Sequence, residues 1–179
     1  YKGTGGWRNS FTYKGFNLGF LIDFKFGAKI FSGTNYQLYY YGMHKNTLNG
    51  RTPENPAGSI VAQGIDEVTG QPNTTAVTSQ DYYRAICNAN IAEEFVYSAD
   101  FIKLRELSFG YTFPKKFLEP LKYVKGLSVS FVARNLWTIM KHTPNIDPES
   151  AINNTNAQGL ELNGYPATRN IGFNINVKF

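Results

Sequence analysis

The stretch that decides the fold reads Phe16-Asn17-Leu18-Gly19-Phe20-Leu21-Ile22-Asp23-Phe24-Lys25-Phe26. All its even-numbered positions are large and apolar, whereas Leu21 is the only apolar odd-numbered position. Successive side chains of a β-strand point to opposite faces, so this alternation predicts a strand with one apolar and one polar face. Eleven residues at about 3.3 Å each reach roughly 36 Å, which is twice the length of a usual globular strand.

The end of the chain repeats this alternation. Ile171, Phe173, Ile175 and Val177 share one parity, and Asn, Gly or Lys fills the positions between them. Less regular patterns predict three more strands, and the apolar parity switches after Leu104, which predicts a β-bulge near Arg105-Glu106. The sequence therefore predicts an all-β fold of about five antiparallel strands, near residues 7–13, 16–30, 101–113, 127–138 and 169–179.

The connections between these strands alternate in length. Lys14-Gly15 is a two-residue hairpin signal, and 114–126 is short, with room for one helical turn. The connections 31–100 and 139–168 are long, and the first could hold a short helix within 79–95. Short turns at one end of a sheet and long loops at the other are typical of an outer-membrane β-barrel, whose long loops are extracellular. At a tilt of about 40°, the strand 16–26 would reach roughly 28 Å, near the height of the apolar band of such barrels.

Five strands cannot close such a barrel, because single-chain bacterial barrels begin at eight strands. An open sheet edge is not viable in hydrocarbon, so the remainder of the same barrel must come from another segment or another chain. The chain also begins at Tyr1, without Met or a signal peptide, which predicts a fragment or a processed piece. Four aromatic residues at or near strand ends would suit an interfacial girdle, namely Trp7, Tyr13, Tyr111 and Trp137.

Composition excludes several other classes of protein. The chain has 179 residues, a net charge of +5 and a single cysteine, Cys87, so a disulfide framework is excluded. No apolar run approaches the roughly 18 residues of a transmembrane helix. The 28 aromatic residues argue against disorder. The basic residues are scattered and accompany no nucleic-acid-binding pattern, so no nucleic-acid partner is predicted.

Residues for catalysis or for a cofactor are not apparent. His44 and His142 lie far apart and outside any H-E-x-x-H pattern, and no nucleophile elbow or P-loop is present. Cys87 lacks a recognisable His and Asn frame, so a small buried residue or a loop residue is the better interpretation. Asp147-Pro148-Glu149 offers two carboxylates, which alone seldom make a calcium site. The sequence predicts no enzyme, no cofactor and no metal site.

Three motifs stand out in the second half of the chain. The first is Asp100-Phe101-Ile102-Lys103-Leu104-Arg105-Glu106-Leu107-Ser108-Phe109-Gly110-Tyr111-Thr112-Phe113-Pro114. The second is Arg134-Asn135-Leu136-Trp137-Thr138, followed by Lys141 and Asp147-Pro148-Glu149. The third is Tyr165-Pro166-Ala167-Thr168-Arg169, which continues to Gly172 and Phe179. In order and spacing, the three motifs resemble the C-terminal region of SusC/RagA-type TonB-linked outer-membrane proteins, although Asn145-Ile146 departs from that family, which usually has Gly and an aromatic residue there.

The resemblance implies the C-terminal part of a 22-stranded transmembrane barrel in the bacterial outer membrane. It implies import of a nutrient, an oligosaccharide or a peptide, beneath a SusD-like lipoprotein lid. TonB would supply energy through an N-terminal region, and neither the plug nor the Ton box lies in these residues. The terminal residues look like the barrel-assembly signal of outer-membrane proteins, namely Phe173, Ile175, Val177 and Phe179.

The candidate site residues fall into two groups. Polar-face residues would line the lumen and hydrate it or hold the plug, namely Asn17, Asp23, Lys25, Arg134, Asn170 and Asn174, with Ser128, Ser130, Asn176 and Lys178 on the same face. Loop aromatics are candidates for contacts with substrate or lid, above all Tyr39, Tyr40, Tyr82 and Tyr83, and also Tyr36 and Tyr41. The alternative function is a soluble, lectin-like all-β module that binds carbohydrate, because a sandwich strand alternates in the same way.

Overall fold

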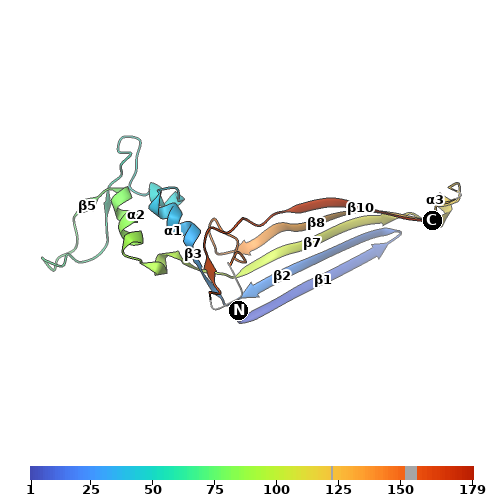
Figure 1. Cartoon of the computed structure of the whole chain (residues 1–179), viewed down its shortest axis with the longest axis horizontal. Coiled ribbons are helices and arrows are strands. Elements are labelled where there is room, and N and C mark those ends of the chain that lie inside the picture. The colour runs from blue at the N-terminus through green and yellow to red at the C-terminus, as the bar shows by residue number, and fades with distance from the viewer. Residues whose placement is uncertain (122, 152–156) are drawn as a thin grey trace.

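The computed structural model describes residues 1–121, 123–151 and 157–179. Its main feature is one long antiparallel sheet with strand order β1-β2-β7-β8-β10 (Figure 1). The strands are β1 (Gly3–Tyr13), β2 (Phe16–Phe26), β7 (Phe101–Thr112), β8 (Gly126–Lys141) and β10 (Asn170–Lys178). Each strand pairs with the sheet strand before it in sequence, so the predicted up-and-down, five-stranded sheet is confirmed. The sheet is open, with β1 and β10 at its two edges.

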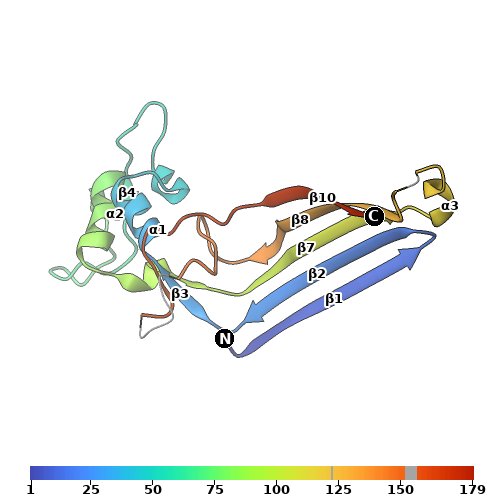
Figure 2. The same cartoon turned by 45° about the vertical axis from the view of Figure 1, so that its right-hand side comes forward.

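The pairing register places the apolar residues of all five strands on one face. One row across the sheet is Tyr13, Phe16, Tyr111, Val129 and Ile175. A second row is Trp7, Ile22, Leu104 and Trp137. Large side chains on this face are open to the surroundings, and Phe173 is 77% exposed. Within the described residues, no second sheet covers this face (Figures 1 and 2).

The short and long connections lie at opposite ends of the sheet, as predicted (Figure 2). Lys14 and Gly15 both have positive φ, 47° and 88°, as a type I′ hairpin turn requires. The connection from β7 to β8 lies at the same end and contains the one-turn helix α3 (Lys115–Leu118). The C-terminus lies there too. The segments between β2 and β7 and between β8 and β10 occupy the other end.

The predicted bulge is confirmed. Against β2, Arg105 is the extra residue, because Ile22 pairs with Leu104 and Leu21 pairs with Glu106. The register between β7 and β8 shifts at the same place, but there Asn135 and Leu136 of β8 lie opposite Arg105. On β8, Asn135 lies opposite this bulge with a positive φ of 51°. Because of the bulge, Leu104 and Leu107 both lie on the apolar face although they are three positions apart in sequence.

Two strand boundaries differ from the predicted ones because of glycine. β1 begins at Gly3, so Trp7 lies in the middle of the strand and not at its end. Gly5 has no side chain of its own, and the ring of Phe24 fills the space beside it, so that a Cβ at Gly5 would lie 2.7 Å from the ring. The strand predicted over 16–30 ends at Phe26, because Gly27 turns the backbone with φ of 82°. The chain then enters β3 (Lys29–Ser32), which belongs to a different sheet.

The long connections form a compact unit at their end of the sheet, called here the loop unit (residues 28–99 with 157–164). It contains β3, α1 (Gly33–Tyr40), η1 (Lys45–Leu48), β4 (Ile60–Val61), β5 (Ala76–Val77), α2 (Ser79–Asn88), η2 (Ala92–Phe95), β6 (Val96–Ser98) and β9 (Leu160–Glu161). The helix predicted within 79–95 is α2, which begins after the N-cap Thr78. Residues 152–156 of the predicted loop 139–168 lie outside the described residues.

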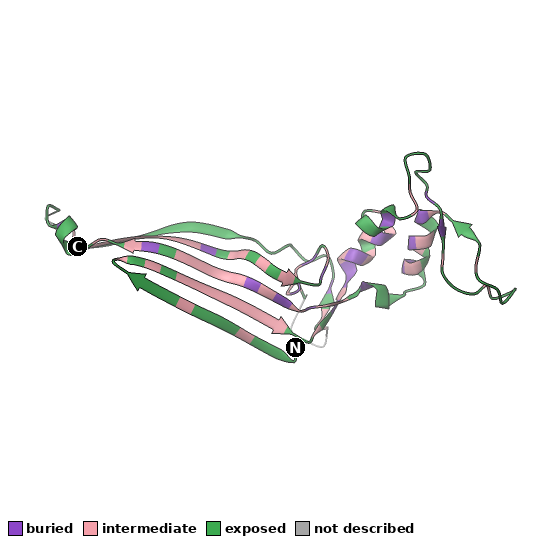
Figure 3. Ribbon diagram, turned by 180° about the vertical axis from the view of Figure 1, so that it is seen from behind, coloured by how far each residue is buried: buried purple, intermediate pink, exposed green. Residues whose placement is uncertain are grey.

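The buried core of the molecule lies mainly in the loop unit (Figure 3). Tyr39, Ile60, Tyr83, Cys87 and Phe95 form its central cluster. Tyr83 and Cys87 are four residues apart, so both lie on the face of α2 that meets α1. Among the described residues, the helices lack the combination of length and apolar character that crossing a membrane requires.

Candidate functional site

The polar face of the sheet carries the residues predicted to line an interior. Asn17, Gly110, Ser130 and Asn174 form one row across four strands. Arg134 pairs with Asn170 on one side and with Glu106 on the other. Toward the loop unit, Asp23 pairs with Lys103 and Lys25 with Phe101. The six predicted residues therefore share one face, opposite to that of Phe20 and Phe173.

At the loop-unit end of this face, charged side chains form a network that we call the charged end (Asp23, Lys25, Lys103, Arg105, Asp147 and Glu149). Lys103 Nζ lies 2.7 and 2.8 Å from the two oxygens of Asp147 and 2.8 Å from Glu149 Oε2. Arg105 Nη2 lies 2.7 Å from the same oxygen of Glu149 and also donates to Asp23. Lys25 Nζ lies 3.2 Å from Glu149 Oε1. Three cations thus meet three carboxylates.

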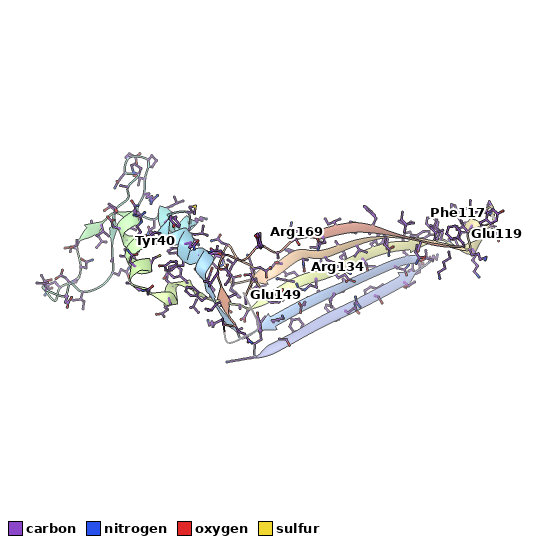
Figure 4. The ribbon with its side chains drawn as sticks, in the orientation of Figure 1. Tyr40, Phe117, Glu119, Arg134, Glu149 and Arg169 are labelled. Carbon is purple, nitrogen blue, oxygen red and sulfur yellow. The ribbon has the colours of Figure 1, made fainter. Side chains whose placement is uncertain are left out.

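The charged end ties the loop after β8 to the wall of the sheet. Asp147 and Glu149 belong to that loop, whereas Asp23, Lys25, Lys103 and Arg105 belong to β2 and β7. Figure 4 shows Glu149 where the sheet meets the loop unit, far from Phe117 and Glu119 at the opposite end. The Lys103 side chain is only 4% exposed. Removing one partner of such a buried pair is costly because the other charge stays buried and uncompensated.

The carboxylate of Glu149 is held ionised by its neighbours. Partial burial alone would raise the pKa of Glu149, but hydrogen bonds and positive charge from Lys103 and Arg105 outweigh that effect and lower the pKa to about 2. The backbone N–H of Glu149 also donates to Asp147 Oδ1 at 2.8 Å, which fixes the turn between the two carboxylates. Glu149 therefore stays charged at any physiological pH.

The β-bulge places two successive residues, Arg105 and Glu106, on the polar face, where they bond to Asp23 and Arg8. In a regular strand only one of two successive side chains would point to that face. In the structure Arg105 donates to Asp23 and, through Nη1, to Asn135 Oδ1 at 3.0 Å. Asn135 in turn donates to the carbonyl of Thr168 at 3.3 Å. The bulge, the left-handed Asn135 and the segment leading into β10 therefore form one connected unit.

A cavity of about 480 Å³ adjoins the charged end. Its lining includes Lys103, Asp147, Lys141 and Arg169. Lys103 and Asp147 neutralise each other, and Lys141 donates to the carbonyl of Ile146 at 3.0 Å. Within the described part of the chain, Arg169 has no ion-pair partner, and Figure 4 shows it beside the same end of the sheet. The cavity is therefore cationic.

A second buried carboxylate anchors β9 to the loop unit. Glu161 is fully buried and accepts hydrogen bonds from Ser32 Oγ at 3.0 Å, Thr34 Oγ1 at 2.6 Å, Thr34 N at 3.2 Å and Gly164 N at 2.8 Å. Burial alone would raise the pKa of Glu161, but these donors lower it below its usual value. Thr34 lies in the first turn of α1, so the positive end of the helix dipole also favours the carboxylate.

The structure separates the predicted loop aromatics into two groups. Tyr39 and Tyr83 are 2% and 6% exposed and belong to the core cluster of the loop unit, which corrects their prediction as surface contacts for substrate or lid. Their hydroxyls are bonded inside the unit, because Tyr39 OH accepts from Asn46 Nδ2 at 2.7 Å and Tyr83 OH donates to Asn46 O at 2.6 Å. Tyr40 and Tyr82 are half-buried, so each keeps part of its ring accessible.

Cys87 and His44 both lie in the loop unit, where burial shifts the pKa of each. Cys87 is fully buried and unpaired, and burial raises the pKa of its thiol. His44 accepts from the backbone N–H of Asn46 through Nδ1 at 3.1 Å, and burial lowers its pKa, so the ring is neutral. Among the described residues, no group of three His, Cys, Asp or Glu side chains is placed to hold a metal ion.

The charged end was only partly visible in the sequence. Asp23 and Lys25 were predicted from their parity, but Lys103, Arg105 and Glu149 were not assigned to a site. The one sequence signal that could have pointed to Arg105 was the switch of apolar parity beside it, because a bulge changes the direction of the side chains next to it. The pairing of these residues with Asp147 and Glu149 links segments more than 40 residues apart, and alternation within one strand carries no information about it.

Comparison with known proteins gives consistent relatives. The chain is 27% identical over 182 residues to TonB-dependent receptor P3 of Formosa agariphila and 28% identical over 178 residues to TonB-dependent receptor P39 of the same bacterium. Each match covers 98% of this chain and 16% of the relative, so the chain spans about one sixth of the length of these receptors. No family model matches the chain.

The fold also has solved counterparts. The structure of the RagAB peptide transporter matches with a TM-score of 0.61 and 22% identity, and the RagAB peptide importer in its open-open state matches with a TM-score of 0.62 and 21% identity. Both matches cover 98% of this chain and 17% of the solved chain. The chain is thus similar over nearly its whole length to TonB-dependent receptors, and its fold is that of part of the RagAB peptide transporter, in agreement with the resemblance that its motifs predicted.

Proposed function

We propose that this chain forms five neighbouring strands in the wall of a 22-stranded outer-membrane barrel that imports a nutrient. The observation that carries the proposal is the single-layer sheet, whose register collects the large apolar side chains on one face and the polar and charged ones on the other. An exposed apolar face of this extent is far larger than a soluble monomer tolerates, and acyl chains would cover it. The polar face would line the lumen.

The two open edges support the same assembly. β1 and β10 each have one hydrogen-bonded neighbour within the described chain, and unpaired strand edges are not viable in hydrocarbon. The remainder of the barrel would pair with both. Phe173, Ile175 and Val177 lie on the apolar face of β10, and Phe179 follows it, where together they would serve as the barrel-assembly signal.

The loop-unit end would face the cell exterior and meet the substrate first. Its cationic cavity and charged end would then lie at the entrance of the path through the barrel. A SusD-like lipoprotein would cover this end, and TonB would act through a plug and Ton box outside these residues. The substrate would be an oligosaccharide or a peptide. The solved counterparts, a RagAB peptide transporter and a RagAB peptide importer, support a role in transport.

The test uses two adjacent residues that differ only in the face they occupy. In the full-length protein in outer-membrane vesicles, with Cys87 replaced by Ala, single cysteines are introduced as Phe173→Cys and Asn174→Cys and carry a nitroxide label. The label at 173 is expected to collide mainly with oxygen dissolved in lipid, and the label at 174 mainly with a water-soluble nickel complex. Equal access of the nickel complex to both positions would contradict the proposal.

The soluble, lectin-like alternative makes the opposite prediction. Such a module would need a second layer over Phe173 and its neighbours, and the described residues provide none. Expression of the full-length gene followed by cell fractionation separates the two functions. Recovery of the folded protein in the soluble fraction, without detergent, would support the lectin-like module.

A further inference from the structure

A small cavity in the loop unit has a composition unlike that of the surrounding core. Its volume is about 190 Å³. Four tyrosines line it, together with Arg51, Thr47, Ser79 and Gln80, and the four tyrosines are Tyr39, Tyr40, Tyr41 and Tyr83. The cavity lies between the C-terminal end of α1 and the first turn of α2. It is separate from the charged end of the sheet.

Arg51 is the unusual member of this lining. Its Nε is covered by protein and has no hydrogen-bond partner, which makes it the one buried side-chain atom without a partner among the described residues. No side-chain hydrogen bond or ion pair of Arg51 to another described residue is present. Buried polar groups in native proteins are nearly always paired, so Arg51, which lines the cavity, has a guanidinium that is short of acceptors.

The neighbouring cation is already engaged, which singles out Arg51. Arg84 donates to the carbonyl of Tyr40 at 3.5 Å and to the side-chain oxygen of Gln80 at 3.0 Å, and its guanidinium stacks over the Tyr40 ring. The nearby Asp81 is bonded to the hydroxyl of Thr78 at 2.6 Å and serves the helix cap. The cavity therefore has one cation without an acceptor, and no carboxylate of the described chain lines it.

The fixed geometry around Arg51 holds its side chain at the cavity. Gly58 lies against the aliphatic part of Arg51, and a Cβ there would come within 3.0 Å of Arg51 Cγ. Gly58 also has a positive φ of 78°, which glycine adopts without strain. A planar guanidinium held in place and short of acceptors matches a carboxylate, which accepts two parallel N–H donors.

We propose that this cavity, called here the Arg51 pocket, binds the carboxylate of one small unit, such as an acidic sugar or an amino-acid residue. The carboxylate pairs with the guanidinium of Arg51, and the half-buried ring of Tyr40 and the exposed ring of Tyr41 contact the body of the unit. The size of the cavity limits the ligand to a single unit and excludes a folded partner. The proposal does not depend on the import function, since it concerns only binding in the loop unit.

The experiment measures binding of four probes to the full-length protein in detergent by saturation-transfer NMR and calorimetry. Sodium D-glucuronate and the sodium salt of N-acetylglycine carry the carboxylate, and D-glucose and N-acetylglycinamide are their neutral counterparts. Both carboxylates are expected to bind more tightly than their neutral counterparts. Tighter binding of glucuronate identifies a sugar as the source of the carboxylate, and tighter binding of N-acetylglycine identifies a peptide unit.

Two variants with the same change of charge locate the binding. Arg51→Gln removes the guanidinium from the pocket and is expected to weaken carboxylate binding at least about tenfold, because hydrogen bonds to charged groups are strong. Lys45→Gln removes an exposed charge from the same unit, outside the pocket, and is expected to change binding less than about twofold. Carboxylate binding that survives Arg51→Gln unchanged would overturn the proposal, as would equal binding of the neutral probes.

A separate measurement shows whether the Arg51→Gln variant still folds. Cys87 is fully buried in the core of the loop unit, so its thiol reports on the unit's integrity through its reactivity with a maleimide, followed by mass spectrometry of the peptide that contains it. If Arg51→Gln leaves Cys87 unreactive, the loss of binding is due to the missing guanidinium. If it exposes Cys87, Arg51→Lys decides, because lysine keeps the charge without the planar fork. Unchanged carboxylate affinity in a folded Arg51→Lys protein would then contradict the proposal, and weaker affinity would support it.

Discussion

Lys103 in strand β7 contacts both carboxylate oxygens of Asp147, which lies 44 residues further along the chain in the loop after β8. The same ammonium group also reaches Glu149. One nearly buried lysine therefore joins the wall of the sheet to a loop that adjoins the cationic cavity. The position of that loop, and with it the shape of the cavity, depends on this charge.

Lys103→Met should release the loop 143–150. Methionine matches the length of the lysine stem but leaves Asp147 without its partner, at a cost of about 3 kcal/mol for a buried pair. Amide hydrogen exchange in this loop is expected to become faster by a factor on the order of 100, while exchange in β1 and β2 stays unchanged. Lys116→Met, an exposed change in the turn that contains α3, serves as the control. Unaltered protection of the loop in Lys103→Met would refute this role.

Acid should loosen the same loop over a defined pH range. The pKa of Glu149 is lowered from 4.5 to about 2 in the folded protein, so its ion pairs stabilise the loop fully above about pH 4.5. That contribution is lost as the pH falls through the range between these two values. Protease resistance of the loop, measured with pepsin, is expected to fall more steeply over this range in the wild type than in Glu149→Gln. Parallel pH profiles of the two proteins would count against the assignment.

The long strands were predictable because they repeat one local rule over many residues. The parity of Phe16–Phe26 and of Ile171–Val177 needs only the two-residue period of a strand, and the parity switch at Arg105 revealed the bulge. The glycine-rich start of β1 was not recognised, because Gly5 is stabilised by the ring of Phe24 on the partner strand. The intrinsic strand propensity of glycine is low, and it takes no account of a ring on the neighbouring strand.

The candidate sites were less predictable because they depend on contacts between distant segments. Tyr39 and Tyr83 lie in a polar, tyrosine-rich stretch that predicts surface contacts, yet their rings pack against each other between α1 and α2, with centroids 5.3 Å apart. Asp23 meets Arg105 from a distance of 82 residues in sequence. Glu161 has no charged partner among the residues that the structure describes, and its four donors come from α1, β3 and its own turn. A single sequence does not reveal such pairings.

Glu161→Gln should weaken the attachment of β9 to the rest of the loop unit. The buried carboxylate meets only donors, and an amide would turn its own NH₂ group toward at least one of them, leaving donors unpaired at a cost of about 1–3 kcal/mol. Exchange of the amides in 157–164 is expected to accelerate by roughly 5- to 150-fold. Glu67→Gln removes an exposed carboxylate in the same unit and should leave this exchange unchanged. Equal exchange rates in the two variants would show that the buried carboxylate is not required.

Two glycines on the polar face should respond oppositely to the same substitution. A Cβ at Gly110 would lie 2.8 Å from Ser130 Cβ and 3.0 Å from Val129 O on the neighbouring strand, whereas a Cβ at Gly172 meets nothing within 4 Å. Gly110→Ala therefore forces β7 and β8 apart and is expected to lower the free energy of unfolding by about 1–3 kcal/mol. Gly172→Ala relieves the entropic cost of glycine in a strand and should be neutral or slightly stabilising.

The measurement for both glycine variants is the folded fraction of the full-length protein in vesicles as urea is raised, read from the faster migration of folded barrels on unheated gels. The midpoint is expected to fall for Gly110→Ala and to stay or rise for Gly172→Ala. Because both residues lie on the polar face, a difference between them reports on the packing of β7 against β8 and not on contact with lipid. Equal midpoints would mean that the close approach at Gly110 does not limit stability, and the register between these two strands would then have to rest on their side chains alone.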